Sequence, residues 1–201
     1  MNPNSDIWYY FIKGNGFQTL GESDQSIVLS TRSLKYQQDR NIYLNLATIY
    51  EKKGDYSRAA RNYAITSVLK PDCTIIHNSW GFCLFHLGKY DEAISKFKRA
   101  VEINPQYTLG YLNWGLCLYW KNEESKAEQI IEEGLRASLY SEKGLLKRYM
   151  SELLMVEKRL ANEMYEMNEE TKEFLEGRAR GYNWILDLIQ EKIEKNVPLF
   201  S

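Results

Sequence analysis

The sequence has little cysteine and little proline: three and four residues, respectively, among 201. Three cysteines cannot form a full disulfide framework, which favours a reducing, intracellular setting. The sequence also lacks an excess of charge of one sign, because it has 27 acidic and 26 basic side chains. The net charge of −1 lacks the basic excess of a nucleic-acid-binding protein, so we expect no nucleic-acid partner.

Long apolar runs are missing as well. The most apolar stretch, residues 111–120, is interrupted by Asn113 and falls short of the roughly 18 residues that a membrane span needs. Residues 1–16 lack the basic region and the apolar stretch of a signal peptide. These absences predict a cytoplasmic protein with no membrane partner.

Catalytic and metal-binding patterns are absent from the sequence. Glycine-rich phosphate loops, nucleophile elbows and zinc-protease motifs are not found, which predicts that the chain is not an enzyme and carries no cofactor. Cys73, His77, Cys83 and His86 are close in sequence. On a helix the last three would spread over more than two turns, too far apart to reach one zinc ion at about 2.0–2.3 Å. We therefore expect no metal site.

What the sequence does have is a high aromatic content, 13%, within a hydrophobic share of 44%, which excludes a disordered chain. It also has an internal repeat. Equivalent positions in successive units are separated by the same number of residues, which we call the repeat offset. The offset carries residues of similar size onto one another: Gly54-Asp55-Tyr56 onto Gly88-Lys89-Tyr90, Ala59 onto Ala93 and Ala127, Tyr63 onto Phe97, Ala47 onto Gly81 and Gly115, and Pro71 onto Pro105.

This pattern resembles the tetratricopeptide repeat, a pair of short helices joined by a turn. The third unit departs from it, with Asn122 in place of the turn glycine and Leu139 in place of proline. Asparagine tolerates the left-handed conformation, so the turn can be kept. Small residues such as Ala47, Gly81 and Gly115 are expected where helices cross closely. The resemblance implies an all-α, right-handed superhelical solenoid with extra helices at both ends.

The predicted organisation has three parts. Residues 1–39 form an N-terminal helical cap or a divergent repeat, with a helix starting after Ser23 or Asp24. Residues 40–141 form three repeats, with bounds of 40–73, 74–107 and 108–141. Residues 142–201 form long C-terminal helices, because apolar residues recur at helical spacing from Leu145 to Met164 and from Phe174 to Ile193.

A functional surface is expected on the concave face of such a solenoid. On the first helix of each unit, one sector points away from the packing face; it includes Glu51 in the first unit and becomes apolar and aromatic in the later ones. The residues predicted to bind a partner there are Leu44, Thr48, Asn78, Phe82, Phe85, His86, Leu112, Asn113, Leu116, Tyr119 and Trp120.

Three interpretations of this surface remain open. It binds a helix or peptide of a protein partner, with Asn78 and Asn113 as polar contacts; or the C-terminal helices fold back and cover it; or it mediates self-association. Members of the family that hold chaperone carboxyl termini use basic groove residues. The matching positions carry none, so that function is not expected: Leu44, Thr48, Ser79, Leu109 and Asn113.

The sequence therefore predicts a non-catalytic protein–protein interaction module, an adaptor, scaffold or chaperone-like protein. The alternative is a structural homo-oligomer assembled through the C-terminal helices.

Overall fold

The computed structural model describes residues 23–34, 39–137, 177, 180–189 and 191. The chain divides into two compact units, Met1–Ile103 and Asn104–Ser201. Every regular element in the described residues is a helix, which confirms the all-α prediction. The predicted helix from Leu145 to Met164 lies outside the described residues.

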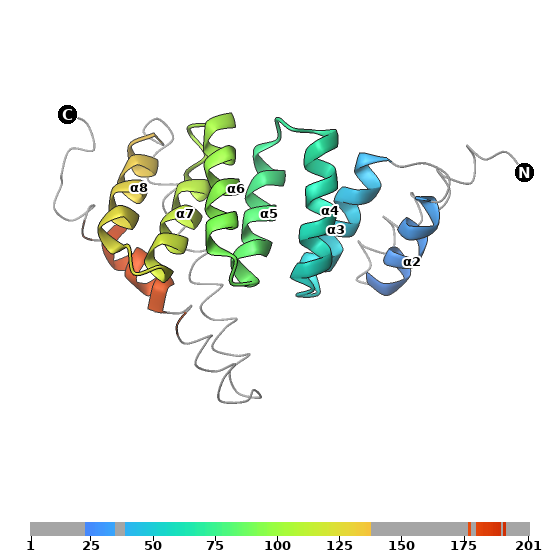
Figure 1. Ribbon diagram of the computed structural model, residues 1–201, viewed down its shortest axis with the longest axis horizontal. Helices are drawn as coiled ribbons and strands as arrows, with labels where there is room; N and C mark the ends of the chain where they lie inside the picture. Colours follow the sequence, from blue (N-terminus) through green and yellow to red (C-terminus); the bar gives the residue numbers. More distant parts are fainter. Residues whose placement is uncertain (1–22, 35–38, 138–176, 178–179, 190, 192–201) are drawn as a thin grey trace, which may run out of the picture. The chain divides into compact units, whose positions relative to one another are not determined.

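Unit 1 consists of two helix pairs preceded by one helix that packs on the first pair (Figure 1). In chain order its helices are α2 (Ser23–Ser33), α3 (Arg40–Lys52), α4 (Tyr56–Leu69), α5 (Thr74–His86) and α6 (Tyr90–Ile103). The described part of α2 starts at Ser23, and the residues before it lie outside the described residues.

Unit 2 contains the third helix pair, α7 (Thr108–Trp120) and α8 (Glu124–Ala137). Residues 177, 180–189 and 191 are also helical, within the range predicted from Phe174 to Ile193. The described part of each unit is thus helical, and the two helices of each pair are joined by a short turn.

The repeat offset is visible in the helix bounds. The first helices of the pairs begin at Arg40, Thr74 and Thr108, and the second helices begin at Tyr56, Tyr90 and Glu124. Each start therefore lies one full repeat after the equivalent start in the preceding pair. The three repeats predicted from the sequence contain one described helix pair each.

The turn inside each pair depends on a residue with positive φ. Gly54 and Gly88 have φ of 76° and 73°, and Asn122 has φ of 58°. The next residue donates its N–H to a carbonyl five positions earlier, at 2.9 Å in all three turns. This bond closes the end of the first helix, as in a Schellman motif. Asn122 keeps the turn that the sequence comparison predicted.

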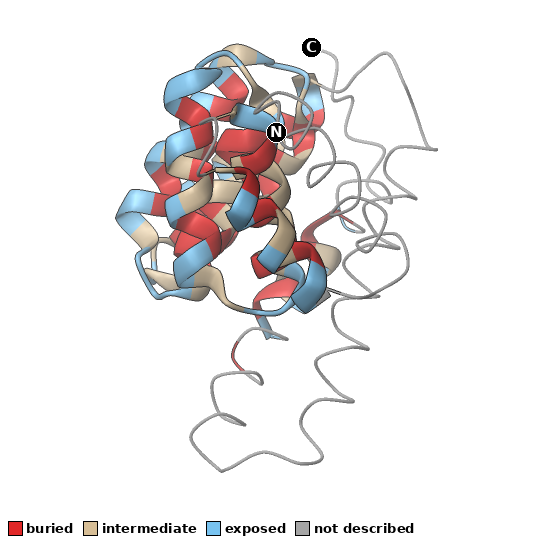
Figure 2. Ribbon diagram, turned by 90° about the vertical axis from the view of Figure 1, so that its right-hand side faces the viewer, coloured by how far each residue is buried: buried red, intermediate tan, exposed pale blue. Residues whose placement is uncertain are grey.

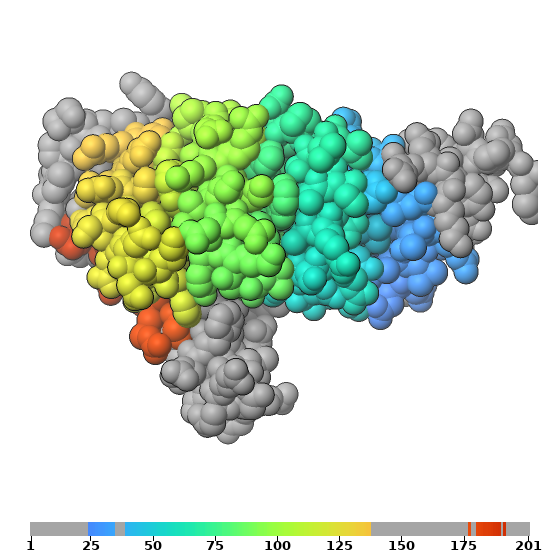
Figure 3. All heavy atoms as spheres, viewed as in Figure 1, coloured from blue at the N-terminus to red at the C-terminus, as the bar shows by residue number. Residues whose placement is uncertain are grey.

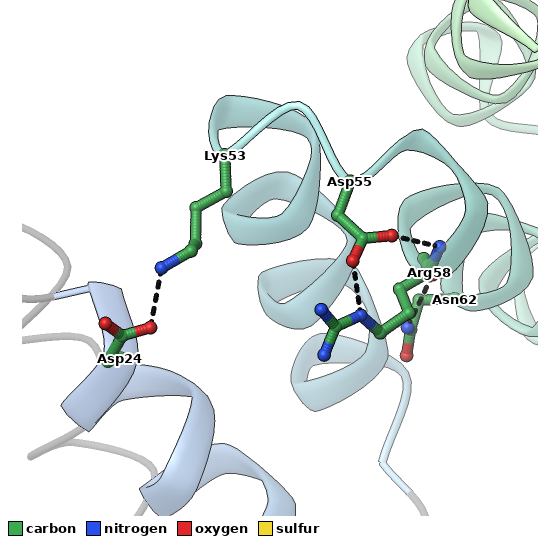
Figure 4. A network of polar contacts seen from close by, with 5 residues as sticks. All are labelled: Asp24, Lys53, Asp55, Arg58 and Asn62. Atoms are coloured by element: carbon green, nitrogen blue, oxygen red, sulfur yellow. Dashed lines mark hydrogen bonds and ion pairs between the residues drawn. The ribbon is translucent and has the colours of Figure 1, made fainter.

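The first turns of α3 and α4 are capped by aspartates. Asp55 accepts from the backbone N–H of Arg58 at 2.9 Å and also from its guanidinium (Figure 4). These contacts, the backbone bond first, hold the pKa of Asp55 below its usual value. Asp24 of α2 pairs with Lys53 at the end of α3, at 2.6 Å. Such exposed ion pairs contribute little to stability.

Close helix crossings occur where the sequence places small residues. A Cβ on Gly81 of α5 would lie 2.7 Å from the ring of Phe97 in α6. A Cβ on Gly115 of α7 would lie 2.6 Å from Ile131 in α8. Both distances are shorter than the non-bonded contacts that Cβ atoms make, so a side chain at either glycine would push the large side chain of the second helix away from the backbone of the first.

Buried residues lie mainly on the sides of the helices that face their neighbours (Figure 2). With side chains drawn, α3 to α6 show no open space between neighbouring helices on the face turned to the viewer (Figure 3). One hydrophobic core cluster of unit 1 draws on three helices: Ile42, Leu46 and Tyr50 of α3, Ala59 and Tyr63 of α4, and Ile76 and Cys83 of α5.

Candidate functional site

In unit 1 the predicted partner-binding residues lie on α3 and α5. Leu44, Thr48, Phe82 and His86 are half-buried. Asn78 is only 7% exposed, and Phe85 is 3% exposed because it packs toward Tyr90 of α6, 5.6 Å between ring centroids. Phe85 therefore belongs to the packing of its own helix pair. We call the remaining surface of α3 and α5, with Ile75 at its start and Glu51, Thr48, Ser79, Phe82 and His86 along it, the α3–α5 surface.

An aromatic cluster forms one part of the α3–α5 surface. The ring of Tyr56, the first residue of α4, stacks on His86 at 4.1 Å and an interplanar angle of 9°. Phe82 meets the edge of His86 at 4.3 Å. The sequence analysis predicts Phe82 and His86 here and gives Tyr56 no role at this surface. Its position beside the turn glycine was the pattern that could have indicated a role at this end of the pair.

A polar cluster forms the neighbouring part of the same surface. The hydroxyl of Tyr63, from α4, donates to Oε2 of Glu51 at 2.6 Å. Thr48 and Ser79 also lie beside that hydroxyl. Three helices thus bring four oxygen-bearing side chains together, although Tyr63 itself is buried. The sequence pattern places Glu51 on this sector and gives it no role.

Burial shifts the proton equilibria of the polar cluster. It raises the pKa of Glu51, and the hydrogen bond from Tyr63 only partly compensates. Burial also raises the pKa of Tyr63, with the Glu51 carboxylate adding to the effect. The same two causes raise the pKa of the Cys83 thiol, which is fully buried on α5. Cys83 is therefore a small core residue with an unreactive thiol.

In unit 2 the predicted residues lie on α7, and the C-terminal segment of the same chain contacts them. Trp184 stacks on Tyr119, with 4.9 Å between ring centroids and 28° between the planes. A Cβ on Gly181 would lie 2.9 Å from Cδ1 of Leu116, and one on Gly177 would lie 2.6 Å from the indole of Trp120. The backbone of a helical segment therefore rests directly on this sector of α7.

Burial differs among the predicted residues of α7. Leu112 and Leu116 are 2% and 3% exposed, whereas Asn113, Tyr119 and Trp120 are half-buried. The described residues of unit 2 thus use the aromatic sector of α7 for contacts within the chain. A partner could reach Leu116 only by moving the segment around Gly181.

The histidines and cysteines are dispersed in the structure. Nε2 of His77 donates to the carbonyl oxygen of Pro71 at 2.8 Å, which ties α5 to the preceding turn. Within the described ranges no three metal-ligating side chains come together. The described helices also include none with the length and apolar character needed to traverse a bilayer.

Comparison with known proteins identifies the repeat. The tetratricopeptide repeat family matches residues 44–108 and, in a second match, residues 84–138. No curated protein sequence matches the chain.

Solved structures resemble the chain in fold. A MamA protein shares 20% identity at a TM-score of 0.66, over 98% of this chain and 100% of the other. MamA residues 41 to the end from Desulfovibrio magneticus RS-1 share 12% identity at a TM-score of 0.63, over 71% of this chain and 78% of the other. YrrB is described as a tetratricopeptide-repeat protein with an unusual peptide-binding site. It shares 20% identity at a TM-score of 0.61, over 66% of this chain and 69% of the other.

Identities this low establish the fold alone, and that fold is an α-helical solenoid. The sequence matches, the repeat offset and the three helix pairs with equivalent turns agree in register. Residues 44–138 are therefore tetratricopeptide repeats.

Proposed function

We propose that the chain is a non-catalytic protein-interaction module, and that the α3–α5 surface binds a helical or extended segment of a partner protein. Solenoid repeats present continuous surfaces of this kind, and amphipathic helices bind in apolar grooves through a few aromatic or aliphatic anchors. The peptide-binding site named for YrrB, which shares the fold, is in line with this proposal.

The observation that carries the proposal is a difference between equivalent sectors of the repeats. On α7 the sector is covered by the chain's own C-terminal segment. On α5 the equivalent sector begins with Ile75, which is 64% exposed, and continues through the half-buried Phe82 and His86. The segment on α7 also illustrates how a helix can lie on such a sector, with glycines against an indole and a tryptophan against a tyrosine.

The alternative assembly through the C-terminal helices receives no support from the described part of that segment. Its apolar side is buried, and its exposed residues are all polar: Arg180, Asn183, Asp187 and Glu191. A surface of this composition is typical of a helix side that faces solvent.

Selection from a random peptide library displayed on phage tests the proposal. Binders selected on the wild-type protein should lose about 30-fold in affinity for Phe82→Ala, the loss expected of an aromatic anchor worth about 2 kcal/mol. The matched control is Val68→Ala, which removes an exposed apolar side chain from α4. Both variants should keep the wild-type circular dichroism. If no selected binder depends on Phe82, the α3–α5 surface is not the binding site.

A further inference from the structure

Glu51 is unusual among the acidic side chains of unit 1. The neighbouring acids Asp24, Asp55 and Glu92 each pair with a lysine or arginine. Glu51 accepts from the hydroxyl of Tyr63, and no described lysine or arginine lies within 4.0 Å of its carboxylate. It is also half-buried, whereas Asp24 is well exposed.

The described surroundings of Glu51 supply little compensating charge. The facing helix α5 carries neither lysine nor arginine along its whole length. Lys53 is engaged by Asp24, and Arg58 by Asp55. Lys52 is exposed and acts on Glu51 only through longer-range attraction. Within the described residues the carboxylate therefore has no lysine or arginine in direct contact, although it lies in a partly desolvated position.

The side chains next to Glu51 would suit the stem of a long basic residue. Ser79 offers a hydroxyl, and one turn further along α5 the rings of Phe82, His86 and Tyr56 form a continuous aromatic surface. Lysine and arginine pack their methylene stems on apolar surfaces while the charged head reaches a polar partner. Aromatic faces add cation–π attraction, and an ionised pair gives a stronger hydrogen bond than a neutral one.

We propose that the α3–α5 surface selects partner segments that place a lysine or an arginine against Glu51, with apolar residues on either side that pack on the aromatic cluster. The inference rests on the proposed function and adds the chemistry of the partner. Because burial raises the pKa of Glu51, the unbound carboxylate is held at a cost that a partner's cation would relieve.

The test uses the same displayed peptide library, selected in parallel on the wild-type protein, on Glu51→Gln and on Glu102→Gln. Glutamine keeps an oxygen for the hydroxyl of Tyr63, so the fold should be retained. Glu102→Gln removes one negative charge from an exposed position of unit 1 and is the matched control. Sequencing of the binders that depend on Phe82 gives the frequency of lysine and arginine at each position.

Enrichment of lysine or arginine at one position on the wild type and on Glu102→Gln, and its loss on Glu51→Gln, is the expected result. A synthetic peptide from that selection should bind Glu51→Gln about tenfold or more weakly, and its norleucine analogue should bind both proteins equally. Binders that depend on Phe82 but show no basic enrichment, or that keep it with Glu51→Gln, overturn the inference and leave the proposed function standing. A selection without any binder that depends on Phe82 overturns both.

Discussion

The contact of Gly181 with α7 allows the covering of that helix to be tested by a single substitution. A Cβ at this position would lie 2.9 Å from Cδ1 of Leu116 and 3.3 Å from both Trp120 and Tyr119. Leu116 can yield slightly, because its Cδ1 is the end of a flexible side chain. The two aromatic rings are broader and less able to move. Gly181→Leu adds three further carbon atoms for which this contact leaves no room.

Two opposing effects determine how strongly a substitution at Gly181 weakens the docking of the segment on α7. Replacement of a helical glycine gains about 1 kcal/mol of helix propensity, and this gain makes Gly181→Ala close to neutral. Overpacking by leucine costs about 1–3 kcal/mol and also disturbs the nearby stacking of Trp184 on Tyr119. We expect Gly181→Leu to weaken the docking of the segment by about 2 kcal/mol. The undocked population then rises roughly 30-fold.

Hydrogen exchange followed by mass spectrometry measures this population, because local opening sets the exchange rate of the affected amides. Amides of residues 180–189 should exchange faster in Gly181→Leu, while those of α3 to α6 keep their protection. Asn183→Leu is the control, since it places the same side chain on an exposed position of the same helix. The reasoning is refuted if exchange in residues 180–189 is unchanged by Gly181→Leu, or if Asn183→Leu accelerates it equally.

Three further predictions concern unit 1 and the turns. Burial raises the pKa of Glu51 above 4.5, so the folded state binds the proton more tightly and stability falls as the pH rises from 4.5 through the folded-state pKa. Glu51→Gln should remove this loss, with a stability advantage over the wild type that is larger at pH 7 than at pH 4 in urea denaturation. Gly81→Ala should lower the free energy of unfolding by about 1–2 kcal/mol, because the 2.7 Å contact with Phe97 outweighs the propensity gain. Asn122→Val should cost about 1–2 kcal/mol by forcing a β-branched residue to φ of 58°, while Asn122→Gly should stay within about 1 kcal/mol of the wild type.

Each of these has an outcome that would contradict it. For Glu51, an advantage of the variant that is equal at both pH values would show that its carboxyl titrates alike in the folded and unfolded states. For Gly81, the variant Phe97→Leu provides the control, because a smaller side chain should relieve the clash. The double variant should then lose less free energy of unfolding than the two single variants lose together. For Asn122, equal stability of the valine and glycine variants would mean that the turn does not require the left-handed conformation.

The repeat could be predicted from the sequence because its determinants are local and periodic. Gly54, Gly88 and Asn122 fix the turns through their own φ angles, and Gly81 and Gly115 mark the close crossings through the absence of a side chain. These requirements recur at the same place in successive repeats, and a one-dimensional pattern therefore reveals them. The same pattern located the sector of α3 and α5 on which the proposed surface lies.

Burial within that sector was less accessible to sequence reasoning. Phe85, Leu112 and Leu116 share the predicted sector but are nearly fully buried. The angular position of a residue on a helix does not determine its exposure when α5 and α7 are apolar around most of their circumference, because neighbouring elements then cover more than one side. Tyr56 was missed for a related reason, since it reaches the α3–α5 surface from the following helix.

The sequence by itself therefore determined the helices and turns of the tetratricopeptide repeats and the offset between them, because each depends on residues close together in the chain. The tertiary structure alone decided that Glu51 meets Tyr63 and that Trp184 covers Tyr119. These contacts join side chains from separate elements, in the second case elements far apart in the chain, and their formation depends on how the helices pack. The same packing covers the aromatic sector of α7 with the chain's own segment and leaves Ile75 on α5 exposed.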